Sequence, residues 1–123
     1  MAATTELKIR RRIRRKKHIR KVVHGTPERP RLVVFRSLRQ VYVQLVDDVH
    51  GKTLTSISSL SPDVREKVAG KKPVEVGRIV GEACAKKAIE HEIRRVVFDR
   101  NGFPYHGRVK AVAEGARKGG LQL

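Results

Sequence analysis

Three aspartates in this 123-residue chain have the side-chain type that two-metal nucleases use. Paired carboxylates hold divalent metal ions, so Asp47, Asp48 and Asp99 could form such a set if the fold brought them together. The first two, however, are adjacent in an expected turn, and Asp99 is followed at once by Arg100. We expect these acids to form ion pairs that hold loops. A metal-dependent ribonuclease stays open as an alternative.

The other reactive side chains lack the partners that catalysis or metal binding needs. Gly51-Lys52-Thr53 resembles the end of a phosphate-binding loop, but that motif needs a glycine where Val46 stands. The one cysteine, Cys84, lies between alanines in an expected helix and fits a small buried thiol. None of the five histidines has another His or Cys at metal-ligand spacing. We therefore expect no enzyme activity, no cofactor, no metal and no small-molecule substrate.

The segment 100–110 combines aromatic and basic residues in one loop. It reads Arg-Asn-Gly-Phe-Pro-Tyr-His-Gly-Arg-Val-Lys and holds two of the five aromatic residues, Phe103 and Tyr105. Planar side chains in a loop can stack on bases, and the helix expected after the loop offers free N–H groups to phosphate. Alternatively, the two aromatic rings only close the end of the domain, and both statements can be partly true. The aromatic and basic residues of this loop that could contact nucleic acid are Arg100, Tyr105, His106, Arg108 and Lys110.

The charge of the chain points to a polyanionic partner, most commonly nucleic acid. It has 29 Lys plus Arg against 12 Asp plus Glu, a net charge of +17, of which +9 lies in residues 1–24. Ten of the fourteen residues from Lys8 to Lys21 are basic and none is acidic. Such a block predicts an arm that is disordered or transiently helical alone, and helical once phosphates neutralise it. The arm residues expected to bind nucleic acid are Lys8, Arg10, Arg11, Arg12, Arg14, Arg15, Lys16, Lys17, Arg20 and Lys21.

Composition also narrows the class of protein. No run of about 18 apolar residues is present, so we expect no membrane span. The N-terminal residues lack the apolar stretch of a secretory signal, and one cysteine excludes a disulfide framework. A non-specific basic protein that acts on membranes or DNA remains a third alternative, although it leaves the loop aromatics unexplained.

The folded part is expected to be an α/β domain with a mixed sheet in the order β-β-β-α-β-α. Residues 1–24 form the arm, residues 25–30 a linker with two prolines and a glycine, and residues 31–123 the domain. A strand, a crossover helix and another strand imply one parallel pairing. Gly77 and Gly81 are expected to let their helix approach the sheet closely. Strands are expected at 32–35, 41–47, 52–59 (an edge strand) and 95–98, and helices at 61–68 (brief), 74–91 and 109–116, the last closed by Gly119-Gly120.

Five sequence blocks carry a resemblance to a known family. They are Arg-Leu-Val-Val-Phe-Arg-Ser (31–37), Val-Tyr-Val-Gln-Leu-Val-Asp-Asp (41–48), Val-Phe-Asp-Arg (97–100), Tyr-His-Gly-Arg-Val-Lys-Ala (105–111) and Ala-Arg-Lys-Gly-Gly-Leu (116–121). In this order the blocks resemble the bacterial form of the large-subunit ribosomal protein L-eighteen family. The departures are a longer, more charged segment at 59–73, Phe103-Pro104 in place of a more polar pair, and Leu123 in place of a terminal Phe.

The resemblance implies a structural ribosomal protein that binds 5S rRNA and helps attach it to 23S rRNA in the central protuberance. It also implies neighbouring large-subunit proteins as partners, a cytoplasmic location on the ribosome, and a ribonuclease-H-like topology without nuclease activity. The arm fits the basic extension of that family in charge. Besides the arm and the 100–110 loop, the RNA-binding residues expected by this match are Arg31, Arg36, Ser37, Arg39, Tyr42 and Gln44.

Overall fold

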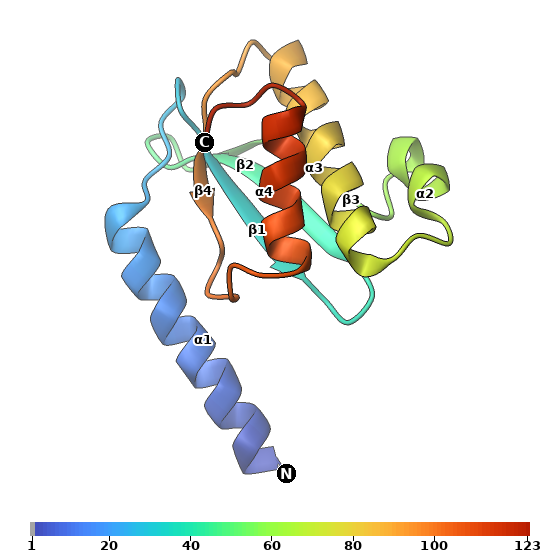
Figure 1. Cartoon of the computed structure of the whole chain (residues 1–123). Coiled ribbons are helices and arrows are strands. Elements are labelled where there is room, and N and C mark those ends of the chain that lie inside the picture. The colour runs from blue at the N-terminus through green and yellow to red at the C-terminus, as the bar shows by residue number, and fades with distance from the viewer. Residues whose placement is uncertain (1) are drawn as a thin grey trace.

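The computed structural model describes residues 2–123, with side chains described from Thr5 onward. Four strands form one mixed sheet in the order β3-β2-β1-β4, and four helices surround it (Figure 1). The prediction of an α/β fold with a mixed sheet is therefore confirmed. In chain order the elements are α1 (Ala2–Val22), β1 (Arg31–Arg36), β2 (Val41–Asp47), β3 (Lys52–Ser58), α2 (Pro62–Val68), α3 (Pro73–Glu90), β4 (Val97–Asp99) and α4 (Arg108–Lys118).

The pairing of the strands follows from the turns and crossovers of the sequence. β1 and β2 form an antiparallel hairpin, and β3 adds antiparallel to β2 as an edge strand, as predicted. β4 lies parallel to β1, which confirms the parallel pairing expected after the crossover helix. Because β1 and β4 run in the same direction, their carboxyl ends lie at one edge of the sheet. The helices α3 and α4 both begin near that edge (Figure 1).

One face of the sheet packs against α3 and α4 and forms the core. Residues of β1 and β2 alternate, so that Leu32, Val34, Val43 and Leu45 are fully buried while the residues between them point to the opposite face. Burial of these side chains is the main stabilising contribution of a domain of this size. The alternation leaves the opposite face of the sheet without α3 or α4 upon it.

The glycines of α3 serve a different contact from the one expected. A Cβ added at Gly81 would lie 2.2 Å from the carbonyl oxygen of Val112, and one at Gly77 would lie 2.6 Å from that of Arg108. Both of these carbonyl groups belong to α4. The close approach is therefore between α3 and α4 and not between α3 and the sheet. Gly115 of α4 meets Arg78 in the same way, at 2.1 Å. At each of these contacts a glycine of one helix lets the backbone of the other helix approach closely.

The fourth strand is shorter than predicted. The strand expected at 95–98 is observed as β4, and the preceding Arg95 forms an isolated bridge with Gln122 near the C-terminus. The backbone N–H of Val96 donates to the carbonyl of Gln122 at 2.9 Å. Val97 pairs with Arg31, the first residue of β1, so the residues before Val97 lie beyond the start of β1 and pair with the C-terminal segment instead.

The basic N-terminal segment is the helix α1 in the structure, whereas its block of like charges predicts an arm that alone is disordered or transiently helical. A helix of this charge is marginal alone, because like charges four residues apart repel. Contacts with the rest of the molecule, described below, hold its C-terminal half, while its N-terminal end extends away from the sheet (Figure 1). No helix of the described residues is both long and apolar enough to cross a membrane.

Candidate nucleic-acid interface

The sheet face opposite α3 and α4 carries a polar and aromatic strip. Register pairs Phe35 with Tyr42 and Val33 with Gln44, so these four side chains lie side by side on that face. The rings of Phe35 and Tyr42 are 6.1 Å apart between centroids. A groove of about 510 Å³ runs between this strip and α1. Its remaining lining residues are Lys16, Arg20, Ser37 and Asn101.

The helix α1 is held against the molecule by arginine side chains. The guanidinium carbon of Arg12 lies 4.7 Å from the ring centroid of Phe103 and 5.7 Å from that of Phe35, so that cation–π attraction joins helix and domain. Arg15 Nε donates to the carbonyl oxygen of Gly102 at 2.9 Å. A Cβ at Gly102 would lie 2.4 Å from the carbonyl oxygen of Arg12, so only glycine allows this approach. These contacts fix the position of α1, which forms one wall of the groove.

A buried ion-pair network fixes the other end of α1. Arg31 donates to Asp99 through Nη1 at 2.7 Å and to Asp48 through Nε and Nη2 at 2.8 and 2.9 Å. Arg20 Nε of α1 lies 3.4 Å from the same Asp99 carboxylate, which is fully buried. The backbone N–H of Gly25 also donates to Asp48, at 2.7 Å. The hydrogen bonds that Arg31 donates to Asp48 hold the pKa of that carboxyl at about 2, and the same bonds raise the pKa of Arg31.

The three aspartates that could have formed a metal site are therefore engaged elsewhere. Asp47 Oδ2 lies 2.7 Å from Nδ1 of His50, and its Oδ1 accepts the backbone N–H of Val49 at 2.9 Å. Asp48 and Asp99 both form ion pairs with Arg31, which confirms the expectation that these acids form ion pairs. Within residues 2–123, no group of three or more His, Cys, Asp or Glu side chains is arranged to hold a metal ion. Burial raises the pKa of the Cys84 thiol to about 12, which suits an inert core residue.

The loop before α4 contains two aromatic residues, one buried and one exposed. Phe103 is buried against Phe35, with ring centroids 5.7 Å apart, so it closes the end of the domain. Tyr105 is 43% exposed, and its ring meets that of Phe98 edge to face at 5.7 Å. Arg100 Nη1 donates to the carbonyl of Phe103 at 2.9 Å and braces the turn. Of the two rings, only Tyr105 offers a surface to a ligand.

A second hollow, of about 310 Å³, lies where α3 and α4 begin. Arg36 lies at the rim of this hollow, and its guanidinium carbon is 4.9 Å from the ring centroid of Phe103. Arg12 of α1 contacts the same ring. Burial lowers the pKa of Arg108, and the neighbouring Arg36 charge lowers it further. We call this hollow the Arg36–Arg108 pocket. Its lining residues are Arg36, Pro73, Val74, Pro104, His106, Gly107 and Arg108.

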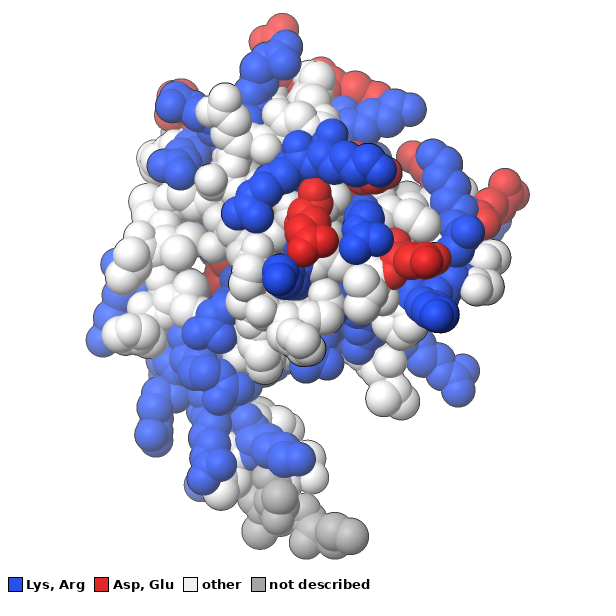
Figure 2. All heavy atoms as spheres, in the orientation of Figure 1, with Lys and Arg blue, Asp and Glu red and all other residues white. Residues whose placement is uncertain are grey.

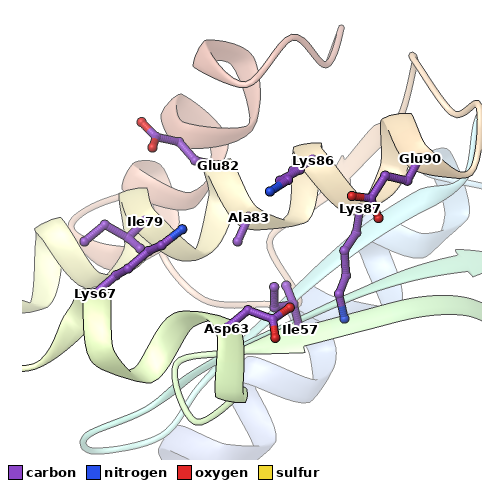
Figure 3. A pocket seen from close by; sticks show the side chains of 9 residues that line it. All are labelled: Ile57, Asp63, Lys67, Ile79, Glu82, Ala83, Lys86, Lys87 and Glu90. Atoms are coloured by element: carbon purple, nitrogen blue, oxygen red, sulfur yellow. The ribbon is translucent and has the colours of Figure 1, made fainter.

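A third hollow has a different character. It lies between α2, α3 and β3, and its floor is apolar (Figure 3). Its rim balances three lysines against three acids, and Lys87 Nζ donates to the backbone carbonyl of Ser56 at 3.3 Å. A balanced rim offers no net attraction to a polyanion. The charged lining residues are Asp63, Lys67, Glu82, Lys86, Lys87 and Glu90.

The molecule is electrically two-sided. Basic side chains crowd along α1, whereas acidic and basic side chains intermingle over the face formed by α3 and α4 (Figure 2). Ion pairs such as Arg78–Glu114 and Lys118–Glu82 lie between those two helices. Around Lys16, in contrast, burial together with the charges of Arg20 and Arg12 lowers the lysine pKa. Basic side chains without neighbouring acids are therefore dense along α1, whose Lys16 and Arg20 line the groove.

The structure brings many of the sequence-predicted RNA-binding residues to this basic side. Lys16, Arg20, Ser37, Tyr42 and Gln44 line the groove, and three further residues line the Arg36–Arg108 pocket. Arg31 stands apart, because its guanidinium is used inside the protein. The remaining predicted residues are placed as follows: Lys8, Arg10, Arg11, Arg14, Lys17 and Lys21 are exposed on α1, Arg12 and Arg15 dock α1, Arg39 is exposed in the β1–β2 turn, Arg100 braces the loop, Tyr105 is exposed there, and Lys110 is exposed on α4.

Several lining residues were missing from the sequence-based set. Val33 and Phe35 belong to the open face because they alternate with buried Leu32 and Val34, a signal hidden in a run that is apolar throughout. Asn101 enters the groove from a turn with a positive φ of 55°. Pro73 and Val74 come from the start of α3, and nothing in the sequence links them to the loop before α4.

Comparison with known proteins identifies the family of the chain. The family described as ribosomal L18 of archaea, bacteria, mitochondria and chloroplasts matches residues 6–123. The chain is 54% identical over 113 residues to the large ribosomal subunit protein uL18 of Thermotoga neapolitana, covering 92% of this chain and 93% of that protein. It is 51% identical over 116 residues to the uL18 protein of Dictyoglomus turgidum, covering 93% and 95%. The chain therefore belongs to the uL18 family of ribosomal proteins.

Proposed function

We propose that this chain is a structural component of the large ribosomal subunit that binds 5S rRNA and helps attach it to 23S rRNA in the central protuberance. There it lies beside other large-subunit proteins. The relatives are large-subunit proteins by name, and family membership makes the chain a structural ribosomal protein and not an enzyme. The strand order β3-β2-β1-β4 supports the related proposal of a ribonuclease-H-like topology.

The single observation that carries the proposal is the groove between α1 and the open sheet face. Lys16 and Arg20 supply positive charge along one wall, and Tyr42 and Gln44 supply a ring and an amide on the other. Cations bind phosphates without regard to sequence, whereas rings and amides distinguish unpaired bases. The groove thus combines both kinds of RNA contact within one surface.

We assign different tasks to the two parts of the chain. The basic arm, α1 within residues 1–24, neutralises phosphates, and the domain at 31–123 selects the RNA through its sheet face and the 100–110 loop. The network of Arg31, Asp48 and Asp99 supports this assignment, because it ties the arm to the sheet at a fixed place. Arg31 is accordingly a positioning residue and lies outside the proposed contact set.

The test compares binding to bacterial 5S rRNA and to a scrambled RNA of the same length. Tyr42→Leu keeps an apolar side chain and removes the ring and the hydroxyl, so we expect 5S rRNA affinity to fall about tenfold, because a base stacked on a ring contributes on the order of 1–3 kcal/mol. Binding to the scrambled RNA should change little. A filter-binding titration at fixed salt measures both constants.

Lysine variants separate the groove from general charge. Lys16→Gln should lower 5S rRNA affinity more than Lys52→Gln, although both remove one charge, because Lys52 is exposed on the edge strand β3 away from the groove. Equal losses in the two variants would assign binding to net charge alone. Equal affinity of the unaltered protein for both RNAs would overturn the proposed function.

A further inference from the structure

The Arg36–Arg108 pocket lies at the place in the fold where α/β proteins commonly bind ligands. Ligands of open α/β sheets bind outside the carboxyl ends of parallel strands. β1 and β4 are the parallel pair here, Arg36 is the last residue of β1, and the loop after β4 leads to Arg108 at the start of α4. The start of α3, at Pro73 and Val74, completes the pocket from a third segment.

The charge of the pocket is positive and has no internal counter-ion. Arg36 and Arg108 are close enough for each charge to act on the other, and the lining contains no acidic residue. Within the described part of the chain, neither guanidinium forms an ion pair with a carboxylate. Arginine guanidinium groups bind phosphates in a forked geometry, so an anionic occupant complements this pair. The balanced hollow of Figure 3 lacks this property.

The remaining walls are apolar and suited to a flat group. Pro73, Val74 and Pro104 line the pocket, and Val74 is 42% exposed to solvent. A volume of about 310 Å³ is at the lower end of the range for small-ligand sites, roughly 300–1,000 Å³. An A-form duplex is recognised over a broad surface, whereas single-stranded loops present individual unstacked bases. A hollow of this volume therefore suits one nucleotide better than a helix.

We propose that the Arg36–Arg108 pocket binds one unstacked nucleotide of a single-stranded RNA loop, with its base against Pro73, Val74 and Pro104 and its phosphate at the two arginines. This inference rests on the proposed function, because it takes the RNA to be 5S rRNA. It adds a second contact beyond the groove: the groove follows the backbone beside α1, and the pocket holds a base that has left the stack.

Filling the pocket without changing its charge is the direct test. Val74→Trp places a large side chain in the pocket at an exposed position, and Val49→Trp makes the same change at an exposed valine in the turn after β2. We expect Val74→Trp to lower affinity for bacterial 5S rRNA about tenfold and to reduce the dependence of affinity on salt by no more than about one phosphate contact, because no charge of the protein is lost. Val49→Trp should match the unaltered protein in both measurements.

Chemical probing locates the nucleotide. With the unaltered protein, dimethyl sulfate and 2′-hydroxyl acylation should show one or two protected nucleotides in a 5S rRNA loop that Val74→Trp leaves reactive, while the rest of the footprint persists. Arg108→Gln should release the same nucleotides and reduce the salt slope by about one phosphate contact. Circular dichroism establishes that both variants are folded, and the arginine variant tests the pocket should the tryptophan variant unfold.

The outcomes separate the two proposals. Full affinity and an unchanged footprint for Val74→Trp, or release confined to base-paired nucleotides, would overturn the pocket proposal and leave 5S rRNA binding intact. Failure of the unaltered protein to prefer 5S rRNA over the scrambled RNA would overturn the proposed function itself.

Discussion

Asp99 joins three parts of the molecule through one buried carboxylate. It accepts Arg31 of β1 at 2.7 Å, lies 3.4 Å from Arg20 of α1, and accepts the backbone N–H of Asn101 at 2.8 Å. A buried arginine that loses its partner keeps the cost of desolvation without the compensating attraction. The carboxylate that could have held a metal ion thus holds α1, β1 and the turn after β4 together.

Removing this charge should destabilise the protein substantially. We expect Asp99→Asn to lower the free energy of unfolding by roughly 2–4 kcal/mol, because Arg31 is left with Asp48 alone. Urea unfolding at neutral pH measures the change. Glu114→Gln is the matched control, since it breaks the exposed pair with Arg78 and should cost less than about 1 kcal/mol. Equal effects in the two variants would contradict the importance of the buried network.

Asp48 makes the stability of the protein depend on pH. Its pKa is about 2 in the folded protein and 3.8 ordinarily, so its stabilising contribution is complete above about pH 4 and disappears as the pH falls toward 2. Asp48→Asn should therefore be less stable than the unaltered protein by about 2 kcal/mol at pH 7, with nearly equal stability near pH 2. Urea unfolding across this range measures the difference. A difference that stays constant with pH would show that the Asp48 charge does not cause it.

At the scale of elements, the docking of α1 depends on a backbone approach at Gly102. This residue has a φ of +79°, and the carbonyl of Arg12 occupies the place of its missing side chain. The arginine side chains that hold the helix all lie in its C-terminal half. A helix so rich in like charges has little stability of its own, so its order should depend on this approach.

Gly102→Ala should release α1 from the sheet. We expect faster amide hydrogen exchange in α1, by about tenfold or more, and a loss of helical signal in circular dichroism. Gly51→Ala is a close control, because Gly51 also has a positive φ, of +64°, but faces open space. Gly51→Ala introduces the same kind of backbone strain, roughly 1 kcal/mol, but its new methyl group meets no neighbouring atom. If the two variants have the same exchange rates in α1, the contact with Arg12 does not hold the helix.

At the scale of the whole molecule, the separation of charge predicts two components of RNA binding. Basic residues extend along α1, while the α3 and α4 face is mixed (Figure 2). Phosphate contacts release counter-ions, so affinity supplied by the arm depends steeply on salt. Contacts from the sheet face and the loop depend on the geometry of the RNA and less on ionic strength.

Affinity for 5S rRNA should fall by about 10³–10⁵ between roughly 50 and 200 mM salt, as expected for about six to ten phosphate contacts. A protein that lacks residues 1–24 should show a flatter slope and keep its preference for 5S rRNA over the scrambled RNA. Filter binding across the salt series measures both quantities. Loss of the preference in the shortened protein would show that the arm also selects the RNA.

The sequence by itself determined the strands, the main helices, a parallel pairing for the fourth strand and the family, whereas the structure identified β1 as the partner of that strand. Alternation in Val41–Asp47 and the spacing of apolar residues in α3 are local signals, which depend only on nearby residues. Blocks such as Tyr-His-Gly-Arg-Val-Lys-Ala are specific enough to indicate the family, and matching over residues 6–123 confirms it.

Only the tertiary structure decided how the charged residues are used. Arg31 and Arg36 differ by five positions in one strand, yet Arg31 is buried between Asp48 and Asp99 while Arg36 lines a pocket beside Arg108. Their roles depend on residues far away in the chain, which pattern and composition do not bring together. For the same reason the sequence predicted a free basic arm, whereas long-range contacts with Phe103, Gly102 and Asp99 hold it as a helix beside the sheet.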